Sequence, residues 1–184
     1  MKLITLEGID GSGKTTIIQR LKEILPPDDY VFTREPYLEY TRKTLETKKL
    51  SPYTEALLYT YDRAIHWEDF LNKQQHFVIC DRYKQSSYAY QTSKMVAYDW
   101  LQLANINYKD PDLMIYVMVP FDVAFMRLIK KNEDYDPEFL VDVAAMYEKI
   151  VREAKYEVLV VDGTRNMDEI IGIILRRLNL PPVS

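Results

Sequence analysis

The sequence predicts an α/β fold: a single domain over residues 1–184, built on a five-stranded parallel sheet with helices on both faces. Three observations predict it. Short apolar runs alternate along the chain with segments of helical periodicity, an alternation typical of parallel sheets with right-handed crossovers. The run at 112–119 is apolar from Leu113 onward, as expected for a strand covered on both faces. The length of 184 residues suits one domain.

The strands are expected at short apolar runs bounded by charged or turn-forming residues. The first run carries Leu3, Ile4 and Leu6 and ends at Glu7, and the third ends at Asp81. In chain order, the five strands are expected at 1–7, 30–33, 77–81, 112–119 and 157–161.

The helices are expected where apolar residues recur at three- and four-residue spacing. Proline marks several boundaries, since Pro26 ends one helix while Pro52, Pro120 and Pro137 open others. Ser51 supplies an N-cap before Pro52. In chain order, helices are expected at 14–25, 38–49, 52–71, 82–103, 120–130, 137–155 and 167–178.

A glycine-rich stretch separates the first strand from the first helix and fits the pattern G-x-x-x-x-G-K-[ST] of a phosphate-binding loop. Glycines let several backbone N–H groups converge on one anion, and the helix that follows adds the positive end of its dipole. Lys14 would reach the outer phosphates, and the Thr15 hydroxyl would face a magnesium ion. The predicted ATP-binding residues of this loop are Gly8, Ile9, Asp10, Gly11, Ser12, Gly13, Lys14, Thr15 and Thr16.

The composition is that of an ordinary globular protein, with 47% apolar and 28% charged residues. A net charge of −4 argues against a general nucleic-acid or membrane-surface partner. Cys80 is the only cysteine and is expected to be a small core residue. His66 and His76 show no metal-ligand spacing. With no signal-peptide layout at the N-terminus, a cytoplasmic location is expected.

Charged side chains follow the second and third strands, where a parallel sheet binds its ligands. Arg34 and Glu35 follow the second strand, and Asp81 and Arg82 follow the third. At that edge a carboxylate at Asp81 could hold Mg²⁺ through its waters, or it could cap the next helix. Both readings stay open on the sequence.

These motifs together resemble the thymidylate kinases, P-loop enzymes of the nucleoside monophosphate kinase fold. The resemblance covers nearly the whole chain and rests on residues 7–16, 33–36, 81–91 and 110–113. It implies transfer of the γ-phosphoryl group of ATP to dTMP, giving dTDP and ADP for dTTP biosynthesis. It also implies Mg²⁺ as cofactor and a homodimer.

The resemblance assigns roles to individual residues. In the family, an aromatic side chain stacks on thymine, an arginine reaches a base oxygen, and the arginine of the D-R-Y motif binds the dTMP phosphate. Carried over, the dTMP-binding residues are Asp10, Arg34, Tyr59, Arg63, Arg82, Ser86 and Tyr90. The spacing of four from Arg82 to Ser86 to Tyr90 predicts one shared helix face.

The resemblance weakens at two places. The expected lid, at about 127–136, carries one arginine and two lysines, whereas relatives with a loop like this one usually have several lid arginines. We expect Arg127 to pack on adenine or contact phosphate, and Lys130 or Lys131 to help in the transfer. Residues 37–40 replace two glycines usual after Pro36, which leaves the choice between dTMP, dUMP and other monophosphates open. The expected catalytic residues are Lys14, Arg34, Arg82, Arg127 and Lys131.

Two other functions stay possible on the sequence. A P-loop deoxynucleoside kinase would need a carboxylate base for a neutral hydroxyl, and Glu35 is available. A nucleotide-dependent switch with little transferase activity would bind or hydrolyse ATP without depending on an acceptor. Two arginines directed at the acceptor favour a phosphorylated substrate.

Overall fold

Five parallel strands form one sheet in the order β2-β3-β1-β4-β5, which confirms the predicted fold class. The structure is a computed structural model and describes residues 1–131 and 136–181. The strands are β1 (Lys2–Glu7), β2 (Tyr30–Arg34), β3 (Phe77–Asp81), β4 (Leu113–Met118) and β5 (Glu157–Asp162). All five predicted strands are present, with ends that differ from the expected ones by at most one residue.

The helices connect these strands as the periodicity predicts, with two differences. The expected helix 82–103 is two helices, because Met95 adopts a left-handed conformation with φ 67° between them. The helix opened by Pro52 stops at Asp69, before a short 3₁₀ turn. The helices are α1 (Lys14–Ile24), α2 (Glu39–Thr47), α3 (Pro52–Asp69), α4 (Lys84–Ser93), α5 (Tyr98–Ala104), α6 (Phe121–Ile129), α7 (Pro137–Glu153) and α8 (Met167–Arg177), with a 3₁₀ helix η1 (Leu71–Lys73).

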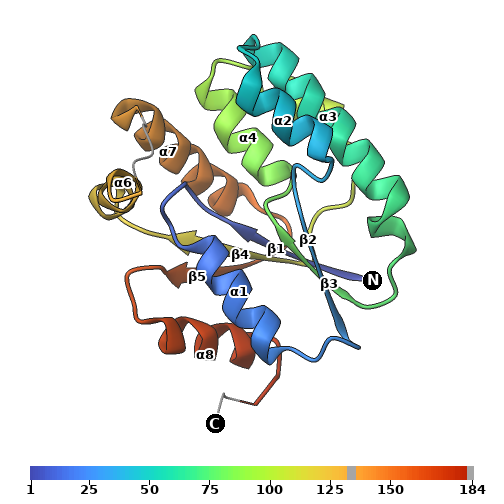
Figure 1. Cartoon of the computed structure of the whole chain (residues 1–184), viewed down its shortest axis with the longest axis vertical. Helices are drawn as coiled ribbons and strands as arrows, with labels where there is room; N and C mark the ends of the chain where they lie inside the picture. Colours follow the sequence, from blue (N-terminus) through green and yellow to red (C-terminus); the bar gives the residue numbers. More distant parts are fainter. Residues whose placement is uncertain (132–135, 182–184) are drawn as a thin grey trace.

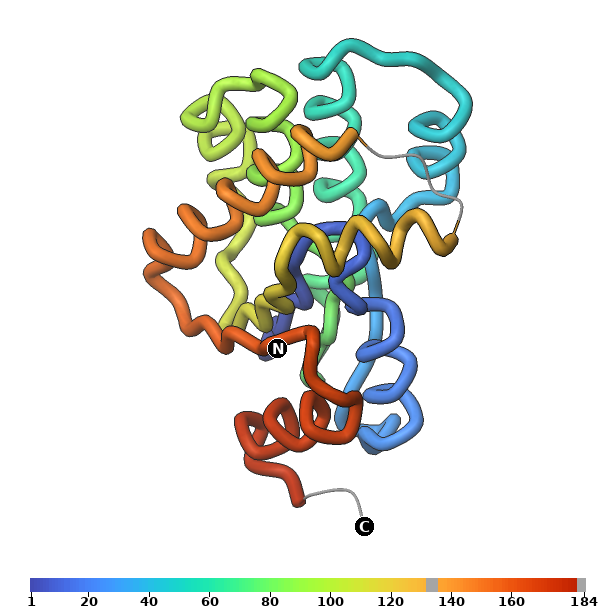
Figure 2. The backbone as a smooth tube through the Cα atoms, turned by 90° about the vertical axis from the view of Figure 1, so that its left-hand side faces the viewer, coloured from blue at the N-terminus to red at the C-terminus, as the bar shows by residue number. Residues whose placement is uncertain are grey.

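The sheet lies between two unequal layers of helices (Figure 1). Helices α1 and α8 contact each other on one face, and α3, α4 and α7 cover the other. The view turned by 90° shows the same division (Figure 2). No helix within residues 1–131 and 136–181 is long and apolar enough to cross a bilayer.

A separate apolar core fills each side of the sheet. The cluster under α1 and α8 joins Ile4, Leu6 and Ile115 of the strands to Ile17 and Ile174 of the helices. On the other side, one cluster joins Met114 and Tyr116 of β4 to α4, α5 and α7. A smaller cluster there joins Leu3 of β1 and Val78 and Cys80 of β3 to Leu71 and Tyr83. Because both faces are covered, β4 is buried along almost its whole length, as its apolar sequence predicts.

The carboxyl ends of the strands meet at one edge, and the charged motifs lie there. The loop at 8–13 follows β1, Glu35 follows β2 and Arg82 follows β3. Gly163 follows β5 and donates its N–H to the Met118 carbonyl at the end of β4. The fold therefore gathers at this edge the residues that the sequence singles out, as expected for an open parallel sheet.

Candidate active site

The loop between β1 and α1 is shaped by glycines that no other residue could replace without strain. Gly8, Gly11 and Gly13 all have positive φ, at 146°, 78° and 102°. A β-carbon on Gly8 would lie 2.6 Å from the Val117 carbonyl, and one on Gly11 would lie 2.5 Å from the Ala124 carbonyl. The loop therefore runs directly against the backbone of β4 and α6.

Lys14 lies folded over this loop and is almost entirely buried. Its ammonium group donates to the carbonyl of Gly8 at 2.9 Å, to the carbonyl of Ile9 at 2.8 Å and to the Ser12 hydroxyl at 3.3 Å. Burial, followed by the charge of Arg82, lowers the pKa of Lys14 to about 7. These three acceptors are uncharged, and a phosphate oxygen would bind the ammonium group more strongly than they do. A bound phosphate could therefore replace them at little cost in free energy.

A cavity of about 490 Å³ opens over the loop and the first turn of α1. Arg127, Lys130 and Lys131 line it, as do Arg165 and the loop residues. Arg127 donates to the carbonyls of Gly11 (3.2 Å), Ser12 (3.3 Å) and Gly163 (2.9 Å), so its guanidinium joins the loop to the end of β5. Of the expected lid at 127–136, residues 132–135 lie outside the described residues.

Thr15 and Asp81 line the same cavity, and their oxygens suit a magnesium ion. The Asp81 oxygen Oδ1 is buried and has no hydrogen-bond partner within the described part of the chain. The N-cap residue of α4 is Tyr83, so Asp81 does not cap that helix. Within that part of the chain no cluster of three or more His, Cys, Asp or Glu could hold a metal alone. A cation here would therefore need phosphate oxygens and water beside these two residues.

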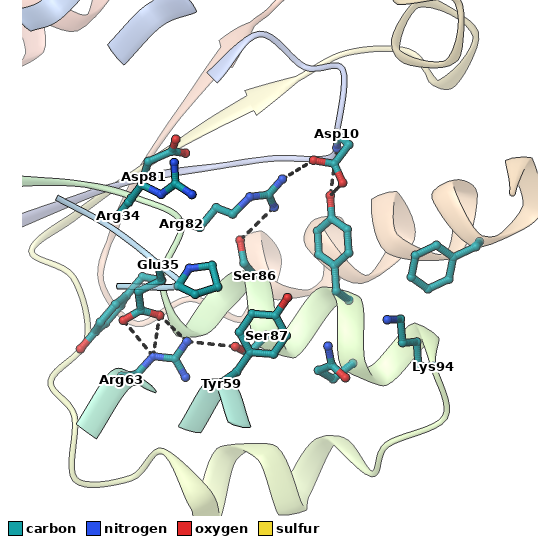
Figure 3. Close-up of a pocket in the computed structure, with 15 residues that line it drawn as sticks. Asp10, Arg34, Glu35, Tyr59, Arg63, Asp81, Arg82, Ser86, Ser87 and Lys94 are labelled. Carbon is teal, nitrogen blue, oxygen red and sulfur yellow. Dashed lines mark hydrogen bonds and ion pairs between the residues drawn. The ribbon is translucent and has the colours of Figure 1, made fainter. Parts of the chain in front are cut away.

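A second cavity, also about 490 Å³, lies on the other side of Arg82 (Figure 3). It is lined from β2, α3, β3, α4 and α7. The two cavities share Asp10, Asp81 and Arg82. They are therefore neighbouring compartments, with a carboxylate and a guanidinium at their junction.

Arg82 is held at this junction by several contacts. Its guanidinium forms an ion pair with Asp10, donates to the Ser86 hydroxyl at 3.4 Å and lies 5.1 Å from the ring centre of Tyr90. The Tyr90 hydroxyl donates to Asp10 at 2.9 Å, and Figure 3 shows the three groups converging. The prediction that Arg82 lies on the helix face is wrong, since α4 begins at Lys84 and Arg82 has φ 65°. Its side chain nevertheless reaches Ser86 and Tyr90.

Arg63 occupies the floor of the second cavity, and its guanidinium is 1% exposed. It binds both carboxylate oxygens of Glu35, at 2.5 to 3.2 Å, and also donates to Ser87 at 2.9 Å and Asn105 at 2.6 Å. His66 closes the network, 3.2 Å from Glu35. Glu35 is thus committed to an ion pair and is poorly placed to act as a general base.

Arg34 and Tyr59 complete the predicted set and also line the second cavity. Arg34 is exposed, and its side chain has no hydrogen bond or ion pair with another described residue, so its guanidinium is available to an anion. Figure 3 draws it beside Asp81 at the carboxyl edge of the sheet. The Tyr59 ring is half-buried, and burial raises the pKa of its phenol to about 12, so the ring is neutral.

The chain after Pro36 has no glycines, yet it turns sharply against α3. The buried carboxylate of Asp62 accepts the N–H groups of Tyr37 at 2.6 Å and Leu38 at 2.9 Å. The Tyr37 ring stacks on His66, with ring centres 4.6 Å apart. A carboxylate and an aromatic stack therefore fix this loop against α3.

The chain matches the thymidylate kinase family model over residues 6–172. It is 36% identical to a probable thymidylate kinase 1 of Saccharolobus solfataricus over 178 residues, covering 92% of this chain and 93% of the relative. It is 35% identical to a thymidylate kinase of Staphylococcus haemolyticus, again over 92% of this chain and 93% of the relative. It is 33% identical to a thymidylate kinase of Mycoplasmopsis agalactiae, over 95% of this chain and 93% of the relative. The chain belongs to the thymidylate kinase family. It is therefore a phosphotransferase of the nucleoside monophosphate kinase class.

The fold brings together most of the residues that the family motifs single out. All seven predicted dTMP-binding residues line the second cavity, and the loop residues from Asp10 to Thr16 line the first. Ser86 lines the cavity too, but its hydroxyl donates to the buried Glu7 at 2.6 Å. The roles given to these residues stay predictions.

Several residues that line the two cavities are not predicted from the sequence. Gln91 and Lys94 continue the α4 face, and their spacing of four and seven from Ser87 could have revealed them. Phe139 comes from α7 and Arg165 follows β5, and no local pattern points to either. Glu7 belongs to the motif at residues 7–16 but is assigned no role from the sequence, although its carboxylate lies directly behind the site.

Proposed function

We propose that this chain transfers the γ-phosphoryl group of ATP to dTMP and releases ADP and dTDP. The main observation behind the proposal is the pair of neighbouring cavities that share Asp10, Asp81 and Arg82. One contains a phosphate-binding loop and the other an arginine-lined space with an aromatic ring. Two such compartments side by side suit a donor and an acceptor whose phosphates meet at the boundary.

On the donor side, we assign the loop N–H groups and Lys14 to the phosphates of ATP. Arg127 would add charge near the same phosphates or a flat face for adenine, since its guanidinium is fixed by three carbonyl groups. Lys130 and Lys131 line the cavity and would help neutralise the charge on the transferred group.

On the acceptor side, we assign Arg34 and Arg82 to the dTMP phosphate, Tyr59 to the pyrimidine ring and Arg63 to a base oxygen. Asp10 and Tyr90 then face the sugar. A monophosphate acceptor is already ionised at neutral pH, so the transfer needs positioning and charge neutralisation rather than a base. This suits a cavity in which Glu35, a buried carboxylate of its lining, is bound to an arginine.

We propose Mg²⁺ as the cofactor, held by Thr15 and by Asp81 through its waters. The unpartnered Asp81 oxygen in the donor cavity supports this assignment. When bound, the ion would neutralise phosphate charge. Asp81 would orient its shell, and Thr15 would fix its place at the start of α1.

The alternative of a deoxynucleoside kinase requires a free carboxylate base near the acceptor. Glu35, the residue available for that task, is 5% exposed and already binds Arg63 and His66. Its engagement disfavours a neutral hydroxyl as acceptor. We therefore expect dTMP to be phosphorylated and thymidine not to be.

A coupled ADP-release assay with ATP–Mg²⁺ tests the proposal against a panel of nucleosides and monophosphates. We expect release to depend on dTMP, with dUMP as the nearest competitor and thymidine inactive. ATP hydrolysis with no dependence on any acceptor would instead point to a nucleotide switch. Thymidine turnover without dTMP turnover would point to the deoxynucleoside kinase.

Two properties implied by the family resemblance belong to the same proposal. We propose a homodimer, which light scattering after size-exclusion chromatography would test. We also propose a cytoplasmic location, which cell fractionation would test.

A further inference from the structure

Glu7 is a fully buried carboxylate directly behind the active site. It ends β1, immediately before Gly8, and its side chain is 0% exposed. Its Oε1 accepts the N–H of Tyr83 at 2.8 Å, and its Oε2 accepts the hydroxyls of Ser86 at 2.6 Å and Tyr147 at 3.0 Å. It lines neither cavity, and it forms no ion pair with another described residue. A buried charge without a direct counter-ion is costly, so its presence calls for a reason.

The carboxylate fixes the turn that directs Arg82 toward the acceptor cavity. Arg82 has φ 65°, a conformation that costs free energy for a residue with a side chain and persists only where its surroundings impose it. Its own N–H donates to the Leu6 carbonyl at 3.0 Å, and the next N–H, of Tyr83, donates to Glu7. The last two residues of β1 thus hold the strained residue from both sides.

Glu7 also orders the hydroxyl that supports the Arg82 guanidinium. When Ser86 donates its only hydrogen to Glu7, the lone pairs of its oxygen are left to accept from Arg82 at 3.4 Å. The same carboxylate lies at the N-terminus of α4, whose N-cap residue Tyr83 makes no side-chain capping bond. A negative charge is favourable there.

We propose that Glu7 is a positioning residue for phosphoryl transfer: in its ionised form it fixes the Arg82 turn and the Ser86 hydroxyl, so that the guanidinium is oriented before dTMP arrives. The inference rests on the proposed function, because that function assigns Arg82 to the acceptor phosphate. Glu7 touches neither substrate in this account. It acts on the reaction only through Arg82 and Ser86.

The ionisation of Glu7 falls in an accessible pH range. Burial raises its pKa from 4.5 to about 7, against the opposing effects of the Ser86 hydrogen bond, the Arg82 charge, the Tyr147 hydrogen bond and the Lys14 charge. Activity that needs the ionised form therefore rises as the pH rises through about 7. The effect on stability has the opposite sign. Because the pKa of Glu7 is higher in the folded than in the unfolded state, Glu7 stabilises the fold at low pH, and this stabilisation is lost as the pH rises through about 7. The titratable groups around Glu7 are Lys14 of α1, Cys80 of β3, Arg82, Tyr147 of α7 and Tyr156 before β5.

The test compares the wild type with Glu7→Gln and Tyr147→Phe. We would measure kcat/KM for dTMP between about pH 5.5 and 9, and the melting temperature of each protein. The kinetics are measured at saturating ATP–Mg²⁺, because bound phosphates keep Lys14 protonated. For Glu7→Gln we expect kcat/KM at pH 8 to fall at least about tenfold. The acid limb, which is the fall in kcat/KM as the pH drops through about 7, should be absent from this variant. Its melting temperature should be no lower than that of the wild type. Tyr147→Phe removes a hydrogen bond that lowers the pKa of Glu7, so its acid limb should move to higher pH.

Glu55→Gln provides the matched control, since it makes the same chemical change in α3 and should leave the acid limb in place. An acid limb unchanged in both Glu7→Gln and Tyr147→Phe would overturn the inference. So would a Glu7→Gln protein whose activity falls only in proportion to its folded fraction. A wild type without dTMP-dependent ADP release would instead refute the proposed function, so the two failures are distinguishable.

Discussion

The donor and acceptor cavities hold their cations in opposite ways. On the donor side, Lys14 is bound by two backbone carbonyls and one hydroxyl, and it has no carboxylate within ion-pair distance among the described residues. On the acceptor side, Arg82 is paired with Asp10, and Arg63 with Glu35, before any ligand is present. Lys14 is thus left without a counter-ion within the described part of the chain, whereas Arg82 and Arg63 have their charges matched in advance.

This difference reflects what each side must do. A triphosphate brings enough charge to restore the proton of a buried lysine, so the donor site can wait with weak neutral contacts. A monophosphate must be oriented for in-line transfer, and guanidinium groups fixed by carboxylates provide that orientation at low entropic cost. The donor side therefore depends on charge and the acceptor side on geometry. Changes on the donor side should therefore lower turnover, and changes on the acceptor side should lower stability or dTMP affinity.

Lys14→Ala should give the largest effect because it removes the only cation within the donor loop. We expect kcat to fall by at least about 10³-fold, the range for losing a group that stabilises charge in phosphoryl transfer. The affinity for dTMP, measured by calorimetry without ATP, should change by less than about twofold, because no acceptor contact is lost. A comparable loss of dTMP affinity would contradict the separation of the two sides.

Glu35→Gln should affect stability more than any other single change on the acceptor side. It leaves the Arg63 guanidinium, which is 1% exposed, without its counter-charge. Removing one partner of a buried ion pair costs about 3–5 kcal/mol, which urea unfolding would measure as a lower free energy of unfolding.

The matched control for that change is Glu55→Gln, whose partner Lys94 is 35% exposed. Glu55 itself is 18% exposed, so water still reaches this pair, and its loss should cost about 1 kcal/mol, well below the cost at Glu35. If the two variants lost equal stability, the Glu35 pair would not be the buried scaffold of the acceptor side.

The same contrast explains what the sequence could and could not predict. The donor loop lies within eight consecutive residues, so its glycines, lysine and threonine form a local pattern with one structural meaning. The strands and helices also follow local periodicity, and their order along the chain is enough to predict a parallel sheet. The phosphate-binding loop itself is therefore predictable from residues 1–25, whereas Arg127 and Arg165 of the donor cavity come from distant parts of the chain.

The acceptor side joins residues far apart in the chain, and local pattern does not predict such pairs. Arg63 meets Glu35 28 positions away, and the residue that caps the Tyr83 N–H comes from 76 positions earlier. The spacing of Arg82, Ser86 and Tyr90 suggested a shared helix face, yet Arg82 reaches that face through a left-handed turn. Tertiary contacts held the backbone against its local preference there.

Tyr59 tests whether the acceptor side also depends on an aromatic surface. Replacing it with alanine should weaken dTMP binding by about 1–3 kcal/mol, the usual contribution of one base stacked on a ring. Tyr59→Phe keeps the ring and should bind dTMP within about twofold of the wild type. Equal losses in the two variants would show that the hydroxyl rather than the ring contributes, and would remove thymine stacking from the account. Calorimetric titration with dTMP measures both.

The lid lysines should give the smallest effect and probe the donor side at its edge. Lys130 and Lys131 are exposed and line the donor cavity, where they supply charge without the rigid geometry of arginine. We expect Lys130→Ala and Lys131→Ala each to lower kcat by less than about tenfold, because a screened surface charge contributes on the order of 1 kcal/mol. Raising the salt concentration should reduce the difference from the wild type. If both variants turned over at the wild-type rate in low salt, these lysines would have no part in the transfer, and the charge on the moving phosphoryl group would be met by Lys14, Arg127 and the bound magnesium alone.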